Sequence, residues 1–436
     1  MTVLLTTVGI VLFVLGVLIS VALHEMGHML PAKAFGMKVT QFFVGFGRTV
    51  WSTRRGETEY GIKAIPAGGF VRIIGMLPPG KGQDPTKVRK ANTGPIQSMV
   101  ENARSAEYET IAPEDNGRLF YQKVWWKKLI VMASGPLVNV LIAAVLFTGL
   151  FTLYGARVPQ TTISTVTDCV IPADQASADR KCQDGDKVSP AKQAGFQVGD
   201  RIVSFNGTPL DPDDGGALRA AIQGANGTVT VVVDRGGRLI TLTPTLIDNQ
   251  VEDAANPGQT VQASFLGVGL VGVYARQSLG AVFVQIGDIV GRTGEALVQL
   301  PSRVPGLFGS VFLGEQRDQN GPVGIVGASR IGGQILALDA PAAAELSFFL
   351  QLLAAVNISL FLFNLLPIPP LDGGQIFPAI WEAIKKRGAR MLGRPDPGPV
   401  DVAKLMPVAY VVALVFIAWS GLLFVADIIN PVVLPQ

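Results

Sequence analysis

The sequence predicts a polytopic α-helical membrane protein with four transmembrane helices, a membrane-associated β-loop and an extracytoplasmic α+β domain. The chain of 436 residues is 48% hydrophobic and only 16% charged, which is typical of a membrane protein with a sizeable soluble part. It also contains four uncharged apolar runs, each long enough to cross ~30 Å of hydrocarbon. The runs predict a lipid bilayer as partner, and the small net charge of +3 gives no reason to expect nucleic acid.

These runs divide the chain into eight expected segments. The spans are residues 1–30, 129–153, 346–372 and 405–427. Between them we expect a cytoplasmic-side β-loop and polar loop (31–128), a compact domain (158–247), an extracytoplasmic amphipathic region (248–345) and a cytoplasmic loop (373–404). The first run lacks a basic leading region and an Ala-x-Ala cleavage site, so we expect a retained span rather than a signal peptide.

The distribution of charge predicts the orientation of these spans. Residues 31–128 carry 16 Lys and Arg against 8 Asp and Glu, and residues 373–404 carry 6 against 3. The long segment 154–345 has the opposite bias, with 14 against 19. Because cytoplasmic loops carry an excess of Lys and Arg, we expect both basic segments in the cytoplasm and the acidic segment, with both termini, outside.

A metal-binding pattern, His24-Glu25-Met26-Gly27-His28, lies at the end of the first run and contains both histidines of the chain. Helical positions i and i+4 share a face, so the two imidazoles can bind one metal. A catalytic Zn²⁺ takes three protein ligands and leaves one position for water, from which Glu25 could take a proton. The alternative is a chance match near a helix end.

Asp372 is the candidate third ligand. It ends an apolar run in which Pro367, Pro369 and Pro370 cannot all lie inside a regular helix. Irregular backbone is tolerated in a membrane where it lines a site enclosed by protein. The predicted orientation places this carboxylate and both histidines at cytoplasmic ends of their spans, which indicates an open zinc site of two His and one carboxylate.

Two amide side chains are further candidates. Asn364 precedes the prolines, and we favour a contact with substrate or with a developing oxyanion over a packing role. Asn139 follows Ser134-Gly135 in the second span, where small residues permit close approach of helices. For Asn139 we favour a hydrogen bond between helices over a contact at the site.

The segment after the first span predicts two strands, Val39–Val50 and Thr58–Met76, joined by a turn at Arg54-Arg55-Gly56. A small sheet packed against the site could present an open edge to a peptide, since strand addition is a common way to hold an extended chain. A plain hairpin without a role in binding is the alternative.

The compact domain contains Ala194-Gly195, Gly199-Asp200, Ile202 and Asn206-Gly207 in the spacing A-G-x-x-x-G-D-x-I-x-x-x-N-G. This pattern resembles a PDZ domain, a fold that binds extended peptides at a sheet edge. The domain could bind peptides in this way, or it could act as a spacer or size filter above the membrane site.

Cys169 and Cys182 are the two cysteines of the chain, and both fall in the segment expected outside. Disulfides persist in that environment, so we predict a bridge between them. Two unpaired thiols are the alternative.

Taken together, the motifs 24–28, 135–139 and 364–373 (N-x-x-P-x-P-x-x-D-G), with the PDZ-like pattern, resemble the bacterial site-2 proteases of the regulator of sigma-E protease type. The resemblance covers essentially the whole chain, and the single PDZ-like domain is similar to the actinobacterial layout. It implies a multi-pass protein of the bacterial cell membrane with Zn²⁺ as cofactor. It also implies metal ligands His24, His28 and Asp372, Glu25 as general base, and Asn364 as a substrate-positioning residue.

The same resemblance implies the substrates. The family cleaves transmembrane segments of anti-sigma factors after a first protease has trimmed them, and some members clear remnant signal peptides. Two rivals from other classes are a catalytically silent membrane scaffold and a metal transporter. The intact ligand set argues against the scaffold, and a single polar cluster at one side of the membrane argues against the transporter.

Overall fold

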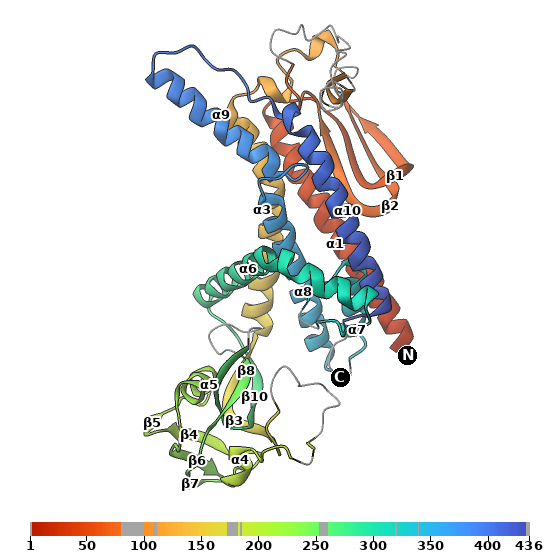
Figure 1. The fold of residues 1–436 in the computed structure, drawn as a ribbon. Helices are drawn as coiled ribbons and strands as arrows, with labels where there is room; N and C mark the ends of the chain where they lie inside the picture. Colours follow the sequence, from red (N-terminus) through yellow and green to blue (C-terminus); the bar gives the residue numbers. More distant parts are fainter. Residues whose placement is uncertain are drawn as a thin grey trace. The chain divides into compact units, whose positions relative to one another are not determined.

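The structure is a computed structural model that describes residues 2–79, 100, 102–105, 107, 111–171, 182–183, 185–252, 260–318, 321–338 and 340–432 (Figure 1). The chain divides into a helical unit, residues 1–148 with 283–434, and an α+β unit, residues 149–282. Most of the polar loop expected after Leu77 lies outside the described residues.

The helical unit contains four helices that are long and apolar enough to cross a membrane, as predicted. They are α1 (Thr2–Ala34), α3 (Trp125–Gly149), α8 (Ala342–Leu365) and α10 (Met406–Ile429). Helix α8 ends at Leu365, before the prolines, because proline lacks the N–H that would continue the helical ladder. The seven residues from 366 to 372 therefore carry Asp372 outside regular helix.

Three further long helices are α6 (Leu279–Phe312), α7 (Ile325–Ile335) and α9 (Gly373–Met391). Short 3₁₀ turns lie at Pro113–Asp115, Phe120–Gln122 and Val402–Leu405. Helix α6 lies in the region expected to be amphipathic and continues through Pro301 and Pro305. Helix α9 replaces an expected loop, because its apolar residues recur at helical spacing between good helix formers.

Strands β1 (Val39–Arg55) and β2 (Thr58–Ile73) follow the two predicted strands and pack against α1. Phe42 pairs with both Tyr60 and Val71, so the first half of β1 lies between the two halves of β2. Tyr60 also pairs with Thr53. Residues 69–73 therefore form an edge of this small sheet, and no other described strand pairs with their outer side.

The α+β unit has a sheet in the order β10-β3-β4-β6-β7, with β5 paired to β4 and a separate β8-β9 hairpin. The strands are β3 (Ala156–Val166), β4 (Arg201–Phe205), β5 (Thr208–Pro209), β6 (Val231–Arg235), β7 (Arg238–Leu242), β8 (Ile247–Glu252), β9 (Thr260–Phe265) and β10 (Val268–Ala275). Helices α4 (Pro190–Gln193) and α5 (Gly215–Gly224) complete the unit, and a five-residue helical turn (Leu150–Tyr154) precedes β3. The core includes Ile163, Phe196, Ile202, Leu218 and Val231.

Two local predictions in this unit are confirmed. Asn206 and Gly207 both have positive φ, and they form the tight turn between β4 and β5. Cys169 and Cys182 form a disulfide. The unit also runs beyond residue 247, where we placed its boundary, because β10 pairs with β3.

Candidate metal centre

The two histidines of the H-E-x-x-H pattern share one face of α1, as predicted from their spacing. Both are buried, and their Nε2 atoms lie 3.2 Å apart. Two positions one turn apart on a helix place their side chains in contact. Helix α1 therefore presents a pair of imidazole nitrogens to the same point.

Asp372 completes a triangle with these nitrogens. Its Oδ2 lies 3.2 Å from His24 Nε2 and 3.3 Å from His28 Nε2. The prolines that end α8 bring this carboxylate back towards α1, and the three residues form the group of potential metal ligands found among the described residues. The sequence prediction that these three side chains meet is thus matched by their positions.

The triangle has the dimensions of a zinc site. Zinc–nitrogen and zinc–oxygen bonds of ~2.0–2.1 Å in a tetrahedron separate the ligand atoms by about 3.3 Å, close to the three distances found. Asp372 Oδ2 is buried and has no hydrogen-bond donor in the described part of the chain. A buried carboxylate oxygen without a donor is costly, and a bound cation would remove that cost.

Hydrogen bonding of the outer ring nitrogen orients His28. Its Nδ1 lies 2.7 Å from the carbonyl oxygen of Val131 on α3. A carbonyl accepts and cannot donate, so Nδ1 carries a proton, and Nε2 of the neutral ring presents a lone pair to the triangle. Sequence reasoning missed this contact, because a backbone carbonyl gives no signal in the sequence.

Gly135 makes room for the same ring. A Cβ atom at this position would lie 2.1 Å from His28 Nε2, and one at Gly27 would lie 2.8 Å from the carbonyl oxygen of Ser134. The two glycines allow α1 and α3 to approach closely. Gly135, one of the small residues predicted to bring helices together, thus lies against the ring of a candidate ligand, beside its Nε2 atom.

Asn139 holds the other histidine. It is buried, its Nδ2 lies 3.2 Å from His24 Nδ1, and its Oδ1 has no partner among the described residues. Half a turn of the amide exchanges these atoms and lets Oδ1 accept the Nδ1–H of His24. That arrangement frees Nε2 for a metal. The contact joins two helices, as we favoured, and it also touches a candidate ligand.

A cavity of about 340 Å³ adjoins the triangle and is lined by Glu25, His28, Asp372 and residues 69–73 of β2. Gly69 brings the strand close to the acid, since a Cβ there would lie 3.1 Å from Glu25 Cγ. The strand that lines the cavity is the edge of the small sheet. The Glu25 carboxylate, the ligand triangle and the open strand edge therefore all border the same cavity.

Asn364 has a different position. It is half-buried in the last turn of α8, and it is not among the residues that line this cavity. Gln375, in the first turn of α9, does line the cavity, and sequence reasoning missed it. In the sequence, only its position three residues after Asp372 indicates that Gln375 lies near the site.

Comparison with known proteins identifies the family of the chain. The family model described as peptidase family M50 matches residues 12–392. The zinc metalloprotease Rip1 of Mycobacterium tuberculosis is 35% identical, over 98% of this chain and 99% of the relative. The protein of the same name from Mycolicibacterium smegmatis is 35% identical, over 97% and 98%. The predicted resemblance is confirmed at the level of the family, and the chain belongs to peptidase family M50.

Proposed function

We propose that this protein is an intramembrane zinc metalloprotease that cleaves transmembrane segments of single-span membrane proteins. The substrates would be anti-sigma factors already trimmed by another protease, and remnant signal peptides. The observation that carries the proposal is the triangle of His24, His28 and Asp372 beside Glu25, in a cavity bordered by a strand edge. His24, His28 and Asp372 would hold Zn²⁺.

Glu25 is the proposed general base. A bound Zn²⁺ would polarise the scissile carbonyl and lower the pKa of water at its open position to roughly 7. The Glu25 carboxylate would take a proton from the water that attacks the scissile carbonyl carbon, and would deliver it to the amine nitrogen released when the C–N bond breaks. Val131 and Asn139 hold the outer nitrogens of the two rings, so the ligands keep their orientation while the proton moves.

The edge of β2 is the proposed binding site for the unwound substrate. A helical segment shields its carbonyls by its own hydrogen bonds, so it must open before hydrolysis. Residues 69–73 line the cavity, and among the described strands they pair only with β1, on one side. Pairing with this edge would offset part of the cost of unwinding. Asn364 would contact substrate that extends towards α8.

The α+β unit is the proposed PDZ domain, and we propose that it binds extended peptide. A groove of about 370 Å³ lies between α5 and the start of β10, lined by Ile222 and residues 264–270. A size-filter role needs no such groove. Titration of the full protein with extended peptides, read by amide hydrogen exchange at 264–270, tests this. Unchanged exchange at saturating peptide would favour the filter.

We also propose the topology predicted from charge. The protein would be a multi-pass protein of the bacterial cell membrane, with the α+β unit and both termini outside and the metal site near the cytoplasmic face. The disulfide between Cys169 and Cys182 supports an outside position for that unit. Labelling of single introduced cysteines with an impermeant reagent in intact cells tests each loop.

The proteolytic mechanism is tested by Glu25→Gln. Wild type and variant are compared on a purified single-span substrate with added zinc, in detergent and in vesicles. We expect the variant to bind zinc normally and to lose cleavage by at least about a hundredfold, the range of general acid–base catalysis. Equal cleavage by both proteins would contradict the mechanism, and zinc content separates a lost base from a lost metal.

A further inference from the structure

Helix α9 (Gly373–Met391) has a feature that catalysis does not explain. It begins eight residues after the end of α8, a candidate membrane span. It cannot itself cross a membrane, because its second half carries Lys385, Lys386, Arg387 and Arg390. It therefore starts at the membrane surface and remains on that side until α10 begins.

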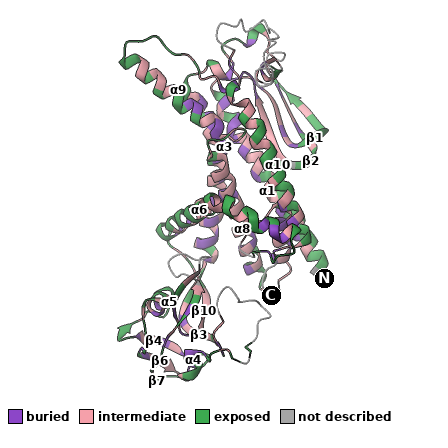
Figure 2. Ribbon diagram, in the orientation of Figure 1, coloured by how far each residue is buried: buried purple, intermediate pink, exposed green. Residues whose placement is uncertain are grey.

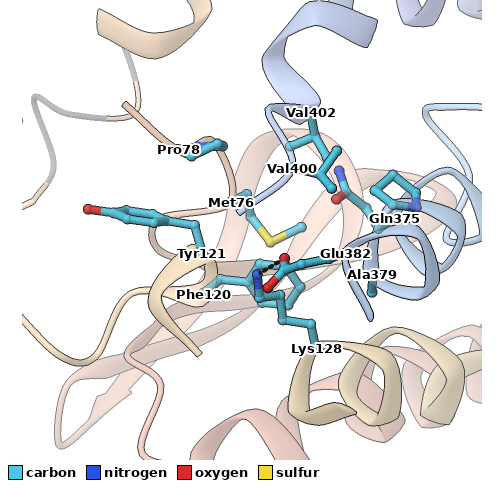
Figure 3. Close-up of a pocket in the computed structure, with 11 residues that line it drawn as sticks. Met76, Pro78, Phe120, Tyr121, Lys128, Gln375, Ala379, Glu382, Val400 and Val402 are labelled. Atoms are coloured by element: carbon cyan, nitrogen blue, oxygen red, sulfur yellow. Dashed lines mark hydrogen bonds and ion pairs between the residues drawn. The ribbon is translucent and has the colours of Figure 1, made fainter. Parts of the chain in front are cut away.

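One side of α9 is occupied by protein. Ala379 and Glu382 face a pocket whose other lining residues include Lys128 of α3 and Val402 (Figure 3). Glu382 Oε2 lies 2.6 Å from Lys128 Nζ, and both side chains are buried. Lys386 Nζ lies 3.1 Å from the other carboxylate oxygen of Glu382. The pair with Lys128 joins α9 to α3 and fixes the rotation of α9 about its axis, whereas the pair with Lys386 lies within α9.

The opposite side is apolar and open. Phe377, Ile380, Trp381 and Ile384 are 58%, 40%, 47% and 56% exposed, and exposed residues recur along α9 in Figure 2. Their spacing of i, i+3, i+4 and i+7 places them on one helical face. No described residue covers this face. Such a face on a helix that adjoins a span is suited to the acyl boundary of a bilayer.

Positive charge borders the apolar face. On a helical projection at 100° per residue, Lys385 lies beside Trp381 at one border and Arg387 beside Ile380 at the other, with Arg390 further round. The sole carboxylate of α9 is Glu382, which faces inward. The charges that α9 presents outward are therefore all cationic, and their stems are long enough to leave the heads at the headgroup level.

We propose that α9 is an interfacial helix that docks on a membrane surface containing anionic lipid. Its apolar face enters the acyl boundary, and Lys385, Arg387 and Arg390 contact lipid phosphates. Asp372 directly precedes the helix, and Gln375 lines the candidate active-site cavity. Docking would thus set the depth of Asp372 in the membrane, a consequence that, unlike the docking, rests on the proposed function.

A fluorescent probe at position 384 tests the docking. Both native cysteines are in the disulfide, so Ile384→Cys supplies a single free thiol for an environment-sensitive label. The full-length protein, in a Glu25→Gln background, is reconstituted into phosphatidylcholine vesicles with or without phosphatidylglycerol, and with lipid that carries a quencher on its acyl chain. We expect quenching at position 384, stronger in the anionic vesicles. Exchanging Lys385, Arg387 and Arg390 together for Gln should abolish that difference.

The matched control is Ala389→Cys, on the side of α9 away from the apolar face. Equal quenching at 384 and 389 would contradict insertion, and equal quenching in neutral and anionic vesicles would contradict recognition of anionic lipid. Disulfide-linked dimers through position 384 in a parallel unlabelled sample, together with no quenching in the labelled one, would show that a second copy covers the face and would overturn the proposal. Because the Glu25→Gln protein is used, failure of proteolysis cannot be mistaken for failure of docking.

Discussion

Two buried polar clusters, one in each unit, differ in how completely their groups are paired. In the α+β unit, Asp200 is 1% exposed in its side chain and accepts from Arg235 through both oxygens and from the backbone N–H of Gln197. In the helical unit, the oxygen of Asp372 that faces two imidazoles has no hydrogen-bond donor among the described residues.

The difference separates a structural cluster from a binding site. A buried carboxylate with every acceptor satisfied stabilises the fold and leaves nothing for a ligand. A cluster that converges on one point without satisfying its members is costly until something occupies that point. The α+β cluster is therefore expected to control stability, and the triangle is expected to control metal binding and catalysis.

The largest effect is expected from Asp372→Ala. This variant tests the contrast between the two clusters, because it removes Oδ2, the buried oxygen that has no donor among the described residues. Removal of the proposed third ligand should leave the protein with little bound zinc and reduce cleavage by more than about a thousandfold, since a bound metal would supply several kcal/mol. Folding should be unaffected or slightly improved, because an unpaired buried acceptor is removed. Metal content by mass spectrometry and thermal unfolding check both parts. Retention of zinc would contradict the assignment of this ligand.

Gly135→Ala should have the next largest effect. The new Cβ would lie 2.1 Å from His28 Nε2, so the ring must move away from the triangle. We expect at least about a tenfold loss of zinc affinity, the lower range for disturbed ligand orientation, together with loss of cleavage. Gly149→Ala is the matched control on the same helix, since nothing lies within 4 Å of its Cβ position. Equal behaviour of the two variants would show that the ring has more room than the structure indicates.

Sequence patterns predicted much of this site because its parts obey local rules. The shared face of His24 and His28 follows from helical periodicity, and the prolines before Asp372 predict where α8 ends. The four spans likewise follow from uninterrupted apolar composition. Each of these signals is contained within a short stretch of chain.

The remainder depends on partners that no local pattern identifies. The contact of His28 with Val131 uses a backbone carbonyl from another helix, and the edge position of residues 69–73 depends on a register in which β1 lies inside β2. Helix α9 was expected to be a loop. The basic residues of this segment were used to predict the orientation of the spans, and the helical spacing of its apolar residues was not considered. These three features depend on contacts between residues far apart in the chain, and a single sequence does not show which residues those are.

Asn139→Ala sharpens the comparison at the amide that contacts His24. Without the amide, His24 keeps its ligand nitrogen but loses the group that orients its ring, so zinc affinity should fall by about 10- to 100-fold. Cleavage at saturating zinc should recover most of the loss. Asn139→Gln extends the amide by one methylene and serves as a shape control. An unchanged zinc affinity in Asn139→Ala would show that the amide contributes packing between α1 and α3 and nothing to the ligand.

The smallest effect on cleavage is expected from Asp200→Asn, which removes charge from the satisfied cluster. Stability of the α+β unit should fall by about 2 kcal/mol, seen as roughly thirtyfold faster amide exchange in residues 149–282 of the full-length protein. Cleavage of an already trimmed substrate should be unchanged. Asp248→Asn, at an exposed position, is the matched control.

The pH dependence of stability in Asp200→Asn shows whether the variant acts through loss of the carboxylate charge or through a change in side-chain packing. Burial raises the pKa of Asp200, but Arg235 and the Gln197 N–H lower it more, so the pKa lies below its ordinary value. A carboxyl with a depressed folded-state pKa contributes stability above its unfolded pKa of about 3.9 and loses it as pH falls through the folded value. The difference in exchange between wild type and Asp200→Asn should therefore be constant from about pH 7 to pH 5 and shrink below about pH 4. A difference that is as large at pH 3 as at pH 7 would mean that Asp200 acts through shape, and the contrast with Asp372 would then rest on the metal site alone.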